Sequence, residues 1–425
     1  MEAEIASERS EILPIGGRND CAIHGREEAA GSNIETAEDQ EGPDVETLEC
    51  TAASLRLLEG REHVRQRPAM YLGDTGSNGL HQLFVGILDD MIEEVFGGCV
   101  SAISVELSAP GALTVKDNGS GISARIDERT GVPHVVMALT LLNYYRSHQG
   151  PYRVPGFRPA FYSCVNFLST WCEVQTRVEG RSYRIRYEQG HLTEALQDMG
   201  ETADHGMTFS WLPDPEIFGD HQYDTEILKG LIRKTCYLTP EVTIRFHDHS
   251  SNSAPEEYHF ERGVADLLAS LNERRETVSD IIAVREVRNQ VLVDVALQFT
   301  TSSIDTSHTF VNNVQTPAGG SHLDGLKLGV RRALGKYARE NGLLPSGAKF
   351  ANVDITYGLT AVIAIRHVHP QFEGATKAKL HNPEIVCPIS QIVEDALMRH
   401  FEQYPDVAAI VLKRAVRTRQ IRLRR

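Results

Sequence analysis

The sequence of 425 residues contains no run of about 18 apolar residues, which a membrane-spanning helix requires. Its N-terminus, MEAEIASERSEI, lacks the apolar segment of a secretory signal peptide. Seven cysteines are scattered without a CxxC pair, so we expect reduced thiols rather than disulfides or a zinc ribbon. No internal repeat is present. The length predicts two or three globular domains. The expected reduced thiols and the lack of a long apolar run favour a cytoplasmic protein with no membrane contact.

Charge is distributed unevenly along the chain. Residues 1–50 hold eleven Glu, three Asp and three Arg, and so carry −11 of the formal charge of −15. Together with few aromatic residues, this composition is typical of a disordered leader. Residues 413–425 hold seven basic residues and no acidic one. This basic tail either binds a polyanion by releasing counterions, or is a solvated helix end, or contacts the acidic leader.

Apolar residues from Leu80 to Phe96 recur at the spacing of an amphipathic helix. The other side of this helix carries Gly86, Asp89, Asp90, Glu93 and Glu94. Two like-charge pairs four residues apart each cost a few tenths of a kcal/mol, and a glycine in mid-helix costs about 1 kcal/mol. The acidic side is therefore either a solvated face or a surface that binds a cation or ligand, since carboxylate oxygens suit Mg²⁺.

Two predicted strands follow this helix, at residues 102–107 and 112–117, and the second runs into the turn DNGSG. Gly119 and Gly121 permit positive φ and close backbone approach to a flat ligand. Asp117 at the end of the strand can accept a hydrogen bond from an exocyclic amine. The same residues also form ordinary tight turns. The order of acidic helix, strand and D-x-G-x-G is therefore more informative than the turn alone.

Taken together, LLEGREHVRQRPAMYLGDTGSNGLHQLFVGILDDMIEEVFGG, VKDNGSGI, GMTFSWLPDPEIF, FVNNVQTPAGGSH and QFEGATKAKLHNPE resemble the family of the DNA gyrase B subunit and the topoisomerase IV ATPase subunit. The resemblance covers roughly residues 51–420. It implies an α+β chain with a GHKL-type (Bergerat) ATPase α/β sandwich over 51–250. A transducer domain with a left-handed βαβ, ribosomal-protein-like fold is expected over 251–405, and a basic C-terminal helix over 406–425. We expect no cleavage-domain module.

The resemblance implies ATP and Mg²⁺ as cofactors, and it assigns roles position by position. The nucleotide-binding positions fall on Asp90, Asp117, Gly119, Gly121, Ile122, Gly156, Thr208 and Lys377. Asp90 stands where the family has a magnesium-holding Asn, and is a weak candidate metal ligand. The general-base Glu position falls on Gly86, which has no side chain to remove a proton. No catalytic residue is therefore assigned.

The phosphate-binding loop departs furthest from the family's GGxxGxG pattern. Only Gly156 is kept, and the other glycine positions fall on Pro155, Pro159 and Phe161. Proline has no N–H to donate, and each hydrogen bond to a charged group contributes about 1.5–3 kcal/mol. We therefore expect the triphosphate to be held much more weakly than in the family. The adenine-supporting Thr position falls on Met207, and Thr208 follows it.

Three functions remain open at this point. The first is a region that has lost ATP hydrolysis and serves as a binding or regulatory module. Its partners would be DNA through the basic tail, topoisomerase subunits, or a second copy in a homodimer. The second is an active ATP-dependent topoisomerase component that uses Glu93 or Glu94 as a substitute base and works with separate cleavage subunits. The third is a pocket that takes another ligand or is packed shut by Phe157 and Phe161.

Overall fold

The computed structural model describes residues 60–142, 144, 151–154, 161–251, 254–345, 347–374 and 376–424. The chain divides into two compact units, Met1–Thr51 and Ala52–Arg425, and every described residue belongs to the second. The predicted acidic leader lies outside the described residues. Within the described ranges, no helix is both long and apolar enough to cross a membrane.

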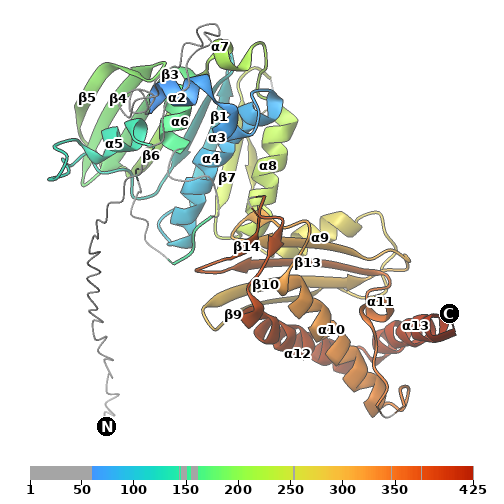
Figure 1. Cartoon of the computed structure of the whole chain (residues 1–425). Helices are drawn as coiled ribbons and strands as arrows, with labels where there is room; N and C mark the ends of the chain where they lie inside the picture. The colour runs from blue at the N-terminus through green and yellow to red at the C-terminus, as the bar shows by residue number, and fades with distance from the viewer. Residues whose placement is uncertain are drawn as a thin grey trace, which may run out of the picture. The chain divides into compact units, whose positions relative to one another are not determined.

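The first half of the second unit is built on an eight-stranded sheet (Figure 1). Its strands run in the spatial order β5-β4-β3-β6-β2-β1-β7-β8. They are β1 (Ala102–Ser108), β2 (Ala112–Asp117), β3 (Ser169–Val178), β4 (Arg181–Glu188), β5 (His191–Glu201), β6 (Gly206–Pro213), β7 (Thr243–Asp248) and β8 (Glu256–Tyr258). The helices of this half are α2 (Arg61–Gln66), α3 (Ala69–Leu72), α4 (Ser77–Phe96), α5 (His134–Thr140), α6 (Phe161–Phe167), α7 (Pro215–Phe218) and α8 (Thr225–Leu238).

Helix α4 lies against this sheet and contains the predicted amphipathic stretch. Its apolar side is buried in the main core, with Leu80, Leu83, Phe84, Ile87, Met91 and Ile92 fully enclosed. The opposite side is not solvated, because Asp90, Glu93 and Glu94 are 7%, 0% and 3% exposed. The interpretation of a solvated acidic face is therefore wrong, and these carboxylates need partners inside the protein.

The second half contains a five-stranded sheet in the order β12-β11-β13-β10-β9. Its strands are β9 (Ile282–Arg288), β10 (Val291–Phe299), β11 (Thr306–Val311), β12 (Val314–Gln315) and β13 (Leu359–Arg366), beside a hairpin of β14 (Phe372–Glu373) and β15 (Lys379–Leu380). The helices are α9 (Val264–Asn272), α10 (Ser321–Glu340), α11 (Asn352–Ile355), η1 (Pro383–Ile385), α12 (Val386–Gln403) and α13 (Pro405–Arg424). Along the chain, the first sheet ends at β8 and the second begins at β9.

Two neighbouring inner strands of this sheet, β10 and β13, are buried on both faces. Helix α9 packs on one face, where Ala296 and Val362 lie in its cluster. Helices α10 and α12 cover the other face (Figure 1), where Val295 and Ile363 lie in the larger cluster. A strand between two helical layers reads as a continuous apolar run rather than an alternating one. The mixed α+β fold class is confirmed by these two sheets and their helices.

The basic tail forms most of helix α13. Its inner side is packed, with Ala408, Val411, Leu412 and Ala415 buried in the second core. Arg414 donates to the carbonyl of Thr300 at 2.6 Å. Arg422 donates to both carboxylate oxygens of the buried Asp354, at 2.9 and 2.8 Å. The inner side of this helix is therefore packed and uses part of its charge inside the protein, while Lys413, Arg417 and Arg424 are exposed.

Candidate functional site

The space above Gly86 is filled by an aromatic ring. Gly86 lies in the middle of α4, and a Cβ added there would sit 1.9 Å from Cδ1 and 2.3 Å from Cγ of Phe161. Phe161 is the first residue of α6, which packs against α4. Real Cβ atoms do not approach side-chain carbons this closely. The ring therefore occupies the place where any side chain at position 86 would begin.

The next residue of α6 engages the candidate metal ligand. The hydroxyl of Tyr162 donates a hydrogen bond to Oδ2 of Asp90. Both side chains are buried, and the Tyr162 ring packs against Phe209 with centroids 5.4 Å apart. A carboxylate can bind a magnesium ion through one oxygen while its other oxygen is hydrogen-bonded to protein. Here Oδ2 of Asp90 is bonded to the phenol of Tyr162.

The other two carboxylates of α4 also have protein partners. Oε1 of Glu93 accepts the N–H of Val154 at 2.7 Å, and its Oε2 lies 3.8 Å from Nε of Arg153. Glu94 accepts both the N–H and the hydroxyl of Ser120, at 3.1 and 3.0 Å. Buried carboxylates bonded in this way are stabilised as structural groups. Both carboxylates are thus bonded to groups of this chain.

Asp117 is at the end of β2 and is enclosed by glycine backbone. Its Oδ1 accepts the N–H of Gly119 at 2.7 Å and that of Met207 at 3.2 Å. A Cβ on Gly206, where φ is +102°, would lie 2.2 Å from the Asp117 carbonyl oxygen, so only glycine fits there. A carboxylate has about four lone-pair positions and can serve several donors at once. The Asp117 side chain is therefore an acceptor held in place by the backbone around it.

The turn after Asp117 is held by a threonine that the sequence did not single out. Oγ1 of Thr176 accepts the N–H of Ile122 at 2.8 Å, and its hydroxyl donates to the Ile122 carbonyl at 2.8 Å. Gly121 has φ of +66°, and a Cβ there would lie 2.8 Å from Thr176 Oγ1. The predicted positions Asp117, Gly119, Gly121 and Ile122 are thus brought together in one buried turn. Thr176 lies on β3, far along the chain, and no local pattern marks it.

Thr208 is not brought to this turn. It pairs with Lys116 in the register of β2 and β6, whereas Asp117 is the next residue along β2. Because successive side chains of a strand point to opposite faces, Thr208 shares a face with Lys116 and not with Asp117. Its hydroxyl accepts a hydrogen bond from Arg177 at 2.7 Å. The fully buried Met207 faces the Asp117 side.

Of the two remaining predicted residues, Gly156 and Lys377, the structure describes only Lys377. Gly156 lies outside the described residues. Lys377 is half-buried, with φ of +55°, in the turn between β14 and β15. This turn is fixed to residues 318–320, because Ala318 donates to the carbonyl of Ala378 at 2.9 Å and Leu380 donates to that of Gly319 at 3.0 Å. Lys377 is therefore held in a defined turn, as a nucleotide contact would need.

Helix α6 contributes no obvious nucleophile. Burial raises the pKa of Cys164 to about 12, so its thiol stays protonated at neutral pH. Among the described residues, no group of three or more His, Cys, Asp or Glu side chains is arranged to hold a metal ion. The described part of the site is thus a buried glycine-containing turn beside a helix whose acidic groups bond to protein.

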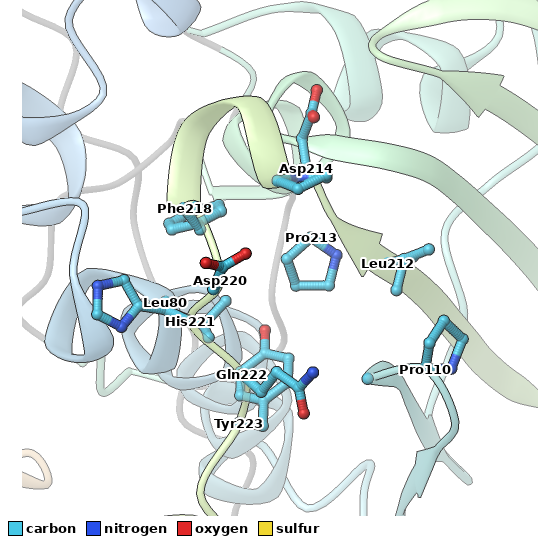
Figure 2. Close-up of a pocket in the computed structure, with 13 residues that line it drawn as sticks. Leu80, Pro110, Leu212, Pro213, Asp214, Phe218, Asp220, His221, Gln222 and Tyr223 are labelled. Atoms are coloured by element: carbon cyan, nitrogen blue, oxygen red, sulfur yellow. The ribbon is translucent and has the colours of Figure 1, made fainter.

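A separate pocket of about 300 Å³ lies at the other end of the same sheet (Figure 2). Pro110 and Gly111, which directly precede β2, line it, and Asp117 at the other end of that strand lies about 17 Å from its first residue, Ala112, at 3.4 Å per residue. The wall includes Asp214, whose Oδ2 accepts from Arg65 at 2.7 Å. That carboxylate is used to join α2 to α7, and the pocket is distinct from the Asp117 turn.

Comparison with known proteins agrees with this architecture. The DNA gyrase B family pattern matches residues 263–425. The chain is 36% identical over 372 residues to the type 2 topoisomerase B subunit of Aquifex aeolicus, covering 87% of this chain and 47% of that protein. It is 35% identical over 378 residues to the DNA gyrase B subunit of Thermus thermophilus, covering 87% of this chain and 59% of that protein. The chain thus spans about half the length of these relatives.

A solved structure extends the match to three dimensions. The 43K ATPase domain of Thermus thermophilus gyrase B, crystallised with an aminocoumarin, superposes with a TM-score of 0.75 at 33% identity. The alignment covers 87% of this chain and 97% of that domain. The ATPase and transducer architecture expected from the motifs is therefore confirmed at the level of the fold. This chain belongs to the DNA gyrase B family and corresponds to its ATPase and transducer region.

Proposed function

We propose that this gyrase-B-like region has lost ATP hydrolysis and acts as a binding or regulatory module that keeps a purine site. The Phe161 ring over Gly86 carries the proposal, because no base can be placed at that position while the ring is there. Bonds from Tyr162 to Asp90 and from Val154 to Glu93 support it, since they occupy the carboxylates that a metal or a water would need.

The adenine end of the site supports retained purine binding. The turn around Asp117 is formed, and Oδ1 of Asp117 is held by the N–H groups of Gly119 and Met207. An exocyclic amine is a donor of the kind that a carboxylate accepts. Oδ2 of Asp90, at the family's magnesium position, is bonded to Tyr162, and the sequence of the phosphate loop has prolines at two of its glycine positions. Affinity is therefore expected to come from the base rather than from the triphosphate.

Calorimetric titration tests this division. We expect adenosine and a non-hydrolysable ATP analogue to bind within about tenfold of each other, a difference of 1.4 kcal/mol, with no effect of Mg²⁺. Asp117→Asn, which keeps the shape of the side chain, should abolish binding of both. Magnesium-dependent tight binding of the analogue, or turnover of Mg-ATP above background, would refute the loss of hydrolysis. Failure of both ligands to bind would refute the retained purine site.

DNA is a partner proposed for the outer side of α13. Lys413, Arg417 and Arg424 are exposed there, whereas the arginines described above bond within the protein. Three phosphate contacts predict a slope of log K against log salt no steeper than about −3 on duplex DNA. Replacing these three residues by Gln should remove the binding, and replacing the exposed Arg245 and Arg262 should not. A steeper slope, or binding that survives the triple replacement, would place the contact elsewhere.

Topoisomerase subunits and a second copy of this chain are the other proposed partners. Family membership supports both, because the relatives are named as subunits of gyrase and type 2 topoisomerase. Light scattering of the full chain with and without ATP separates them. A stable dimer in the absence of ATP supports self-association, and a monomer under both conditions argues against it; binding of a gyrase A subunit added to the chain would support a topoisomerase partner.

A further inference from the structure

The end of β13 is bonded to the first half of the chain through a buried asparagine. Asn312 is fully enclosed and has φ of +45°. Its Oδ1 accepts the N–H of His367 at 2.7 Å, and its Nδ2 donates to the carbonyls of His367, at 2.8 Å, and of Arg153. Its backbone N–H donates to Ile365 at 2.8 Å. The whole amide is therefore used to join residues 365–367 to the segment 151–154.

Arg366, the last residue of β13, makes a second contact with the first half of the chain, through Glu241 and Phe96. Arg366, 9% exposed, donates to both oxygens of Glu241 at 3.0 and 2.8 Å. Its guanidinium also lies over the ring of Phe96, with 4.3 Å from Cζ to the centroid. Such a planar cation can serve a carboxylate and an aromatic face together. Arg285 bonds to Glu241 as well, and holds Asp294 at 2.9 Å.

Both contacts lead back to helix α4. Phe96 is the last residue of α4. The segment that Asn312 grips is the one whose Val154 N–H binds Glu93 of α4. One connection therefore runs from Glu93 through residues 153–154 and Asn312 to β13, and the other from Phe96 through Arg366 to the same strand. Each step is a hydrogen bond or ring contact between buried or half-buried groups.

We propose that Asn312 and Arg366 are positioning residues that couple the acidic helix α4 to the five-stranded sheet through the end of β13. The coupling rests on the contacts of Asn312 with Arg153, of Val154 with Glu93 and of Arg366 with Phe96. It stands whether or not ATP is hydrolysed, and so extends beyond the function proposed above. Residues that share partners in this way show interaction energies that double replacement can measure.

Amide hydrogen exchange on the full chain tests the coupling. Glu93→Ala removes the acceptor of the Val154 N–H, and we expect exchange in residues 359–367 to rise about threefold or more, the lower range for directly linked residues. In a background of Asn312→Asp and Arg366→Lys, the same replacement should produce no such rise. Glu106→Ala, which removes an exposed carboxylate from β1, serves as the matched control and should leave these amides unchanged.

The comparison distinguishes coupling from general destabilisation. If Glu93 only supports the fold, its replacement should raise amide hydrogen exchange throughout the chain. The effect of Glu93→Ala would then be the same in both backgrounds. That outcome, or no rise in residues 359–367 in the native background, would overturn the proposal. The Asp and Lys replacements keep nearly the native volume, and Glu93→Gln supplies a second variant of native size if the alanine variant does not fold.

Discussion

Gly86→Glu is expected to lower the free energy of unfolding by at least about 3 kcal/mol, the upper range for overpacked cores, and to leave Mg-ATP turnover at background. The new Cβ would lie 1.9 Å from the Phe161 ring, so the ring must leave its place. The added carboxylate would also be desolvated beside Asp90. Urea unfolding and a phosphate-release assay measure the two effects.

A matched control exists on another helix. Gly230 is an exposed glycine within α8, and a Cβ there meets nothing within 4 Å. Gly230→Glu should be neutral or stabilising by up to about 1 kcal/mol, because glycine is a poor helix former. Adding Phe161→Gly to Gly86→Glu should recover part of the lost stability. If Gly86→Glu alone is as stable as the native chain, or hydrolyses ATP, the ring does not fill this space.

The pH dependence of stability is expected to contain a large contribution from Asp294. Burial raises its pKa from 3.8 to about 6, against the opposing charge of Arg285, while the negative Glu241 raises it further. The folded state therefore holds the proton more tightly than the unfolded chain. This stabilisation is fully present below pH 3.8 and is lost as the pH rises through 6. About two pKa units correspond to roughly 3 kcal/mol.

Comparison of the native chain with Asp294→Asn isolates this contribution. When the pH is lowered from 7.5 to 4, the free energy of unfolding of the native chain should rise relative to that of the variant by up to roughly 3 kcal/mol. His322 titrates in the opposite sense, because burial lowers its pKa to about 4 and its stabilisation is lost as the pH falls through that value. Since both proteins contain His322, its effect cancels. A difference that does not change with pH would show that Asp294 is ionised normally.

The local structure around the site follows from sequence because it depends on near neighbours. The apolar spacing of residues 80–96 predicts α4, and the two short strands after it are found as β1 and β2. The turn at Asp117 needs glycines at 119 and 121, and both are present. The absence of a base at Gly86 is also visible directly in the sequence, and so is the bulky residue at position 161.

The hydrogen-bond partners of the carboxylates of α4 could not be predicted from the sequence. Tyr162 is 72 residues from Asp90, and Val154 is 61 residues from Glu93. Nothing local tells which distant donor will reach a buried carboxylate. The same holds for the basic tail, where Arg422 finds its partner Asp354 68 residues away. Helix amphipathicity shows that a face is charged, and only the tertiary packing shows whether water or protein satisfies it.

The carboxylates of α4 have a consequence for how such a chain would respond in a cell. A protein that reads ATP changes state with the supply of fuel. Under the function proposed above, a helix whose acidic groups are bonded to tyrosine, serine and backbone would give no comparable response. Its conformation would be indifferent to the energy charge of its surroundings. Its effect in the cell would then be set by the amount of the protein that is synthesised.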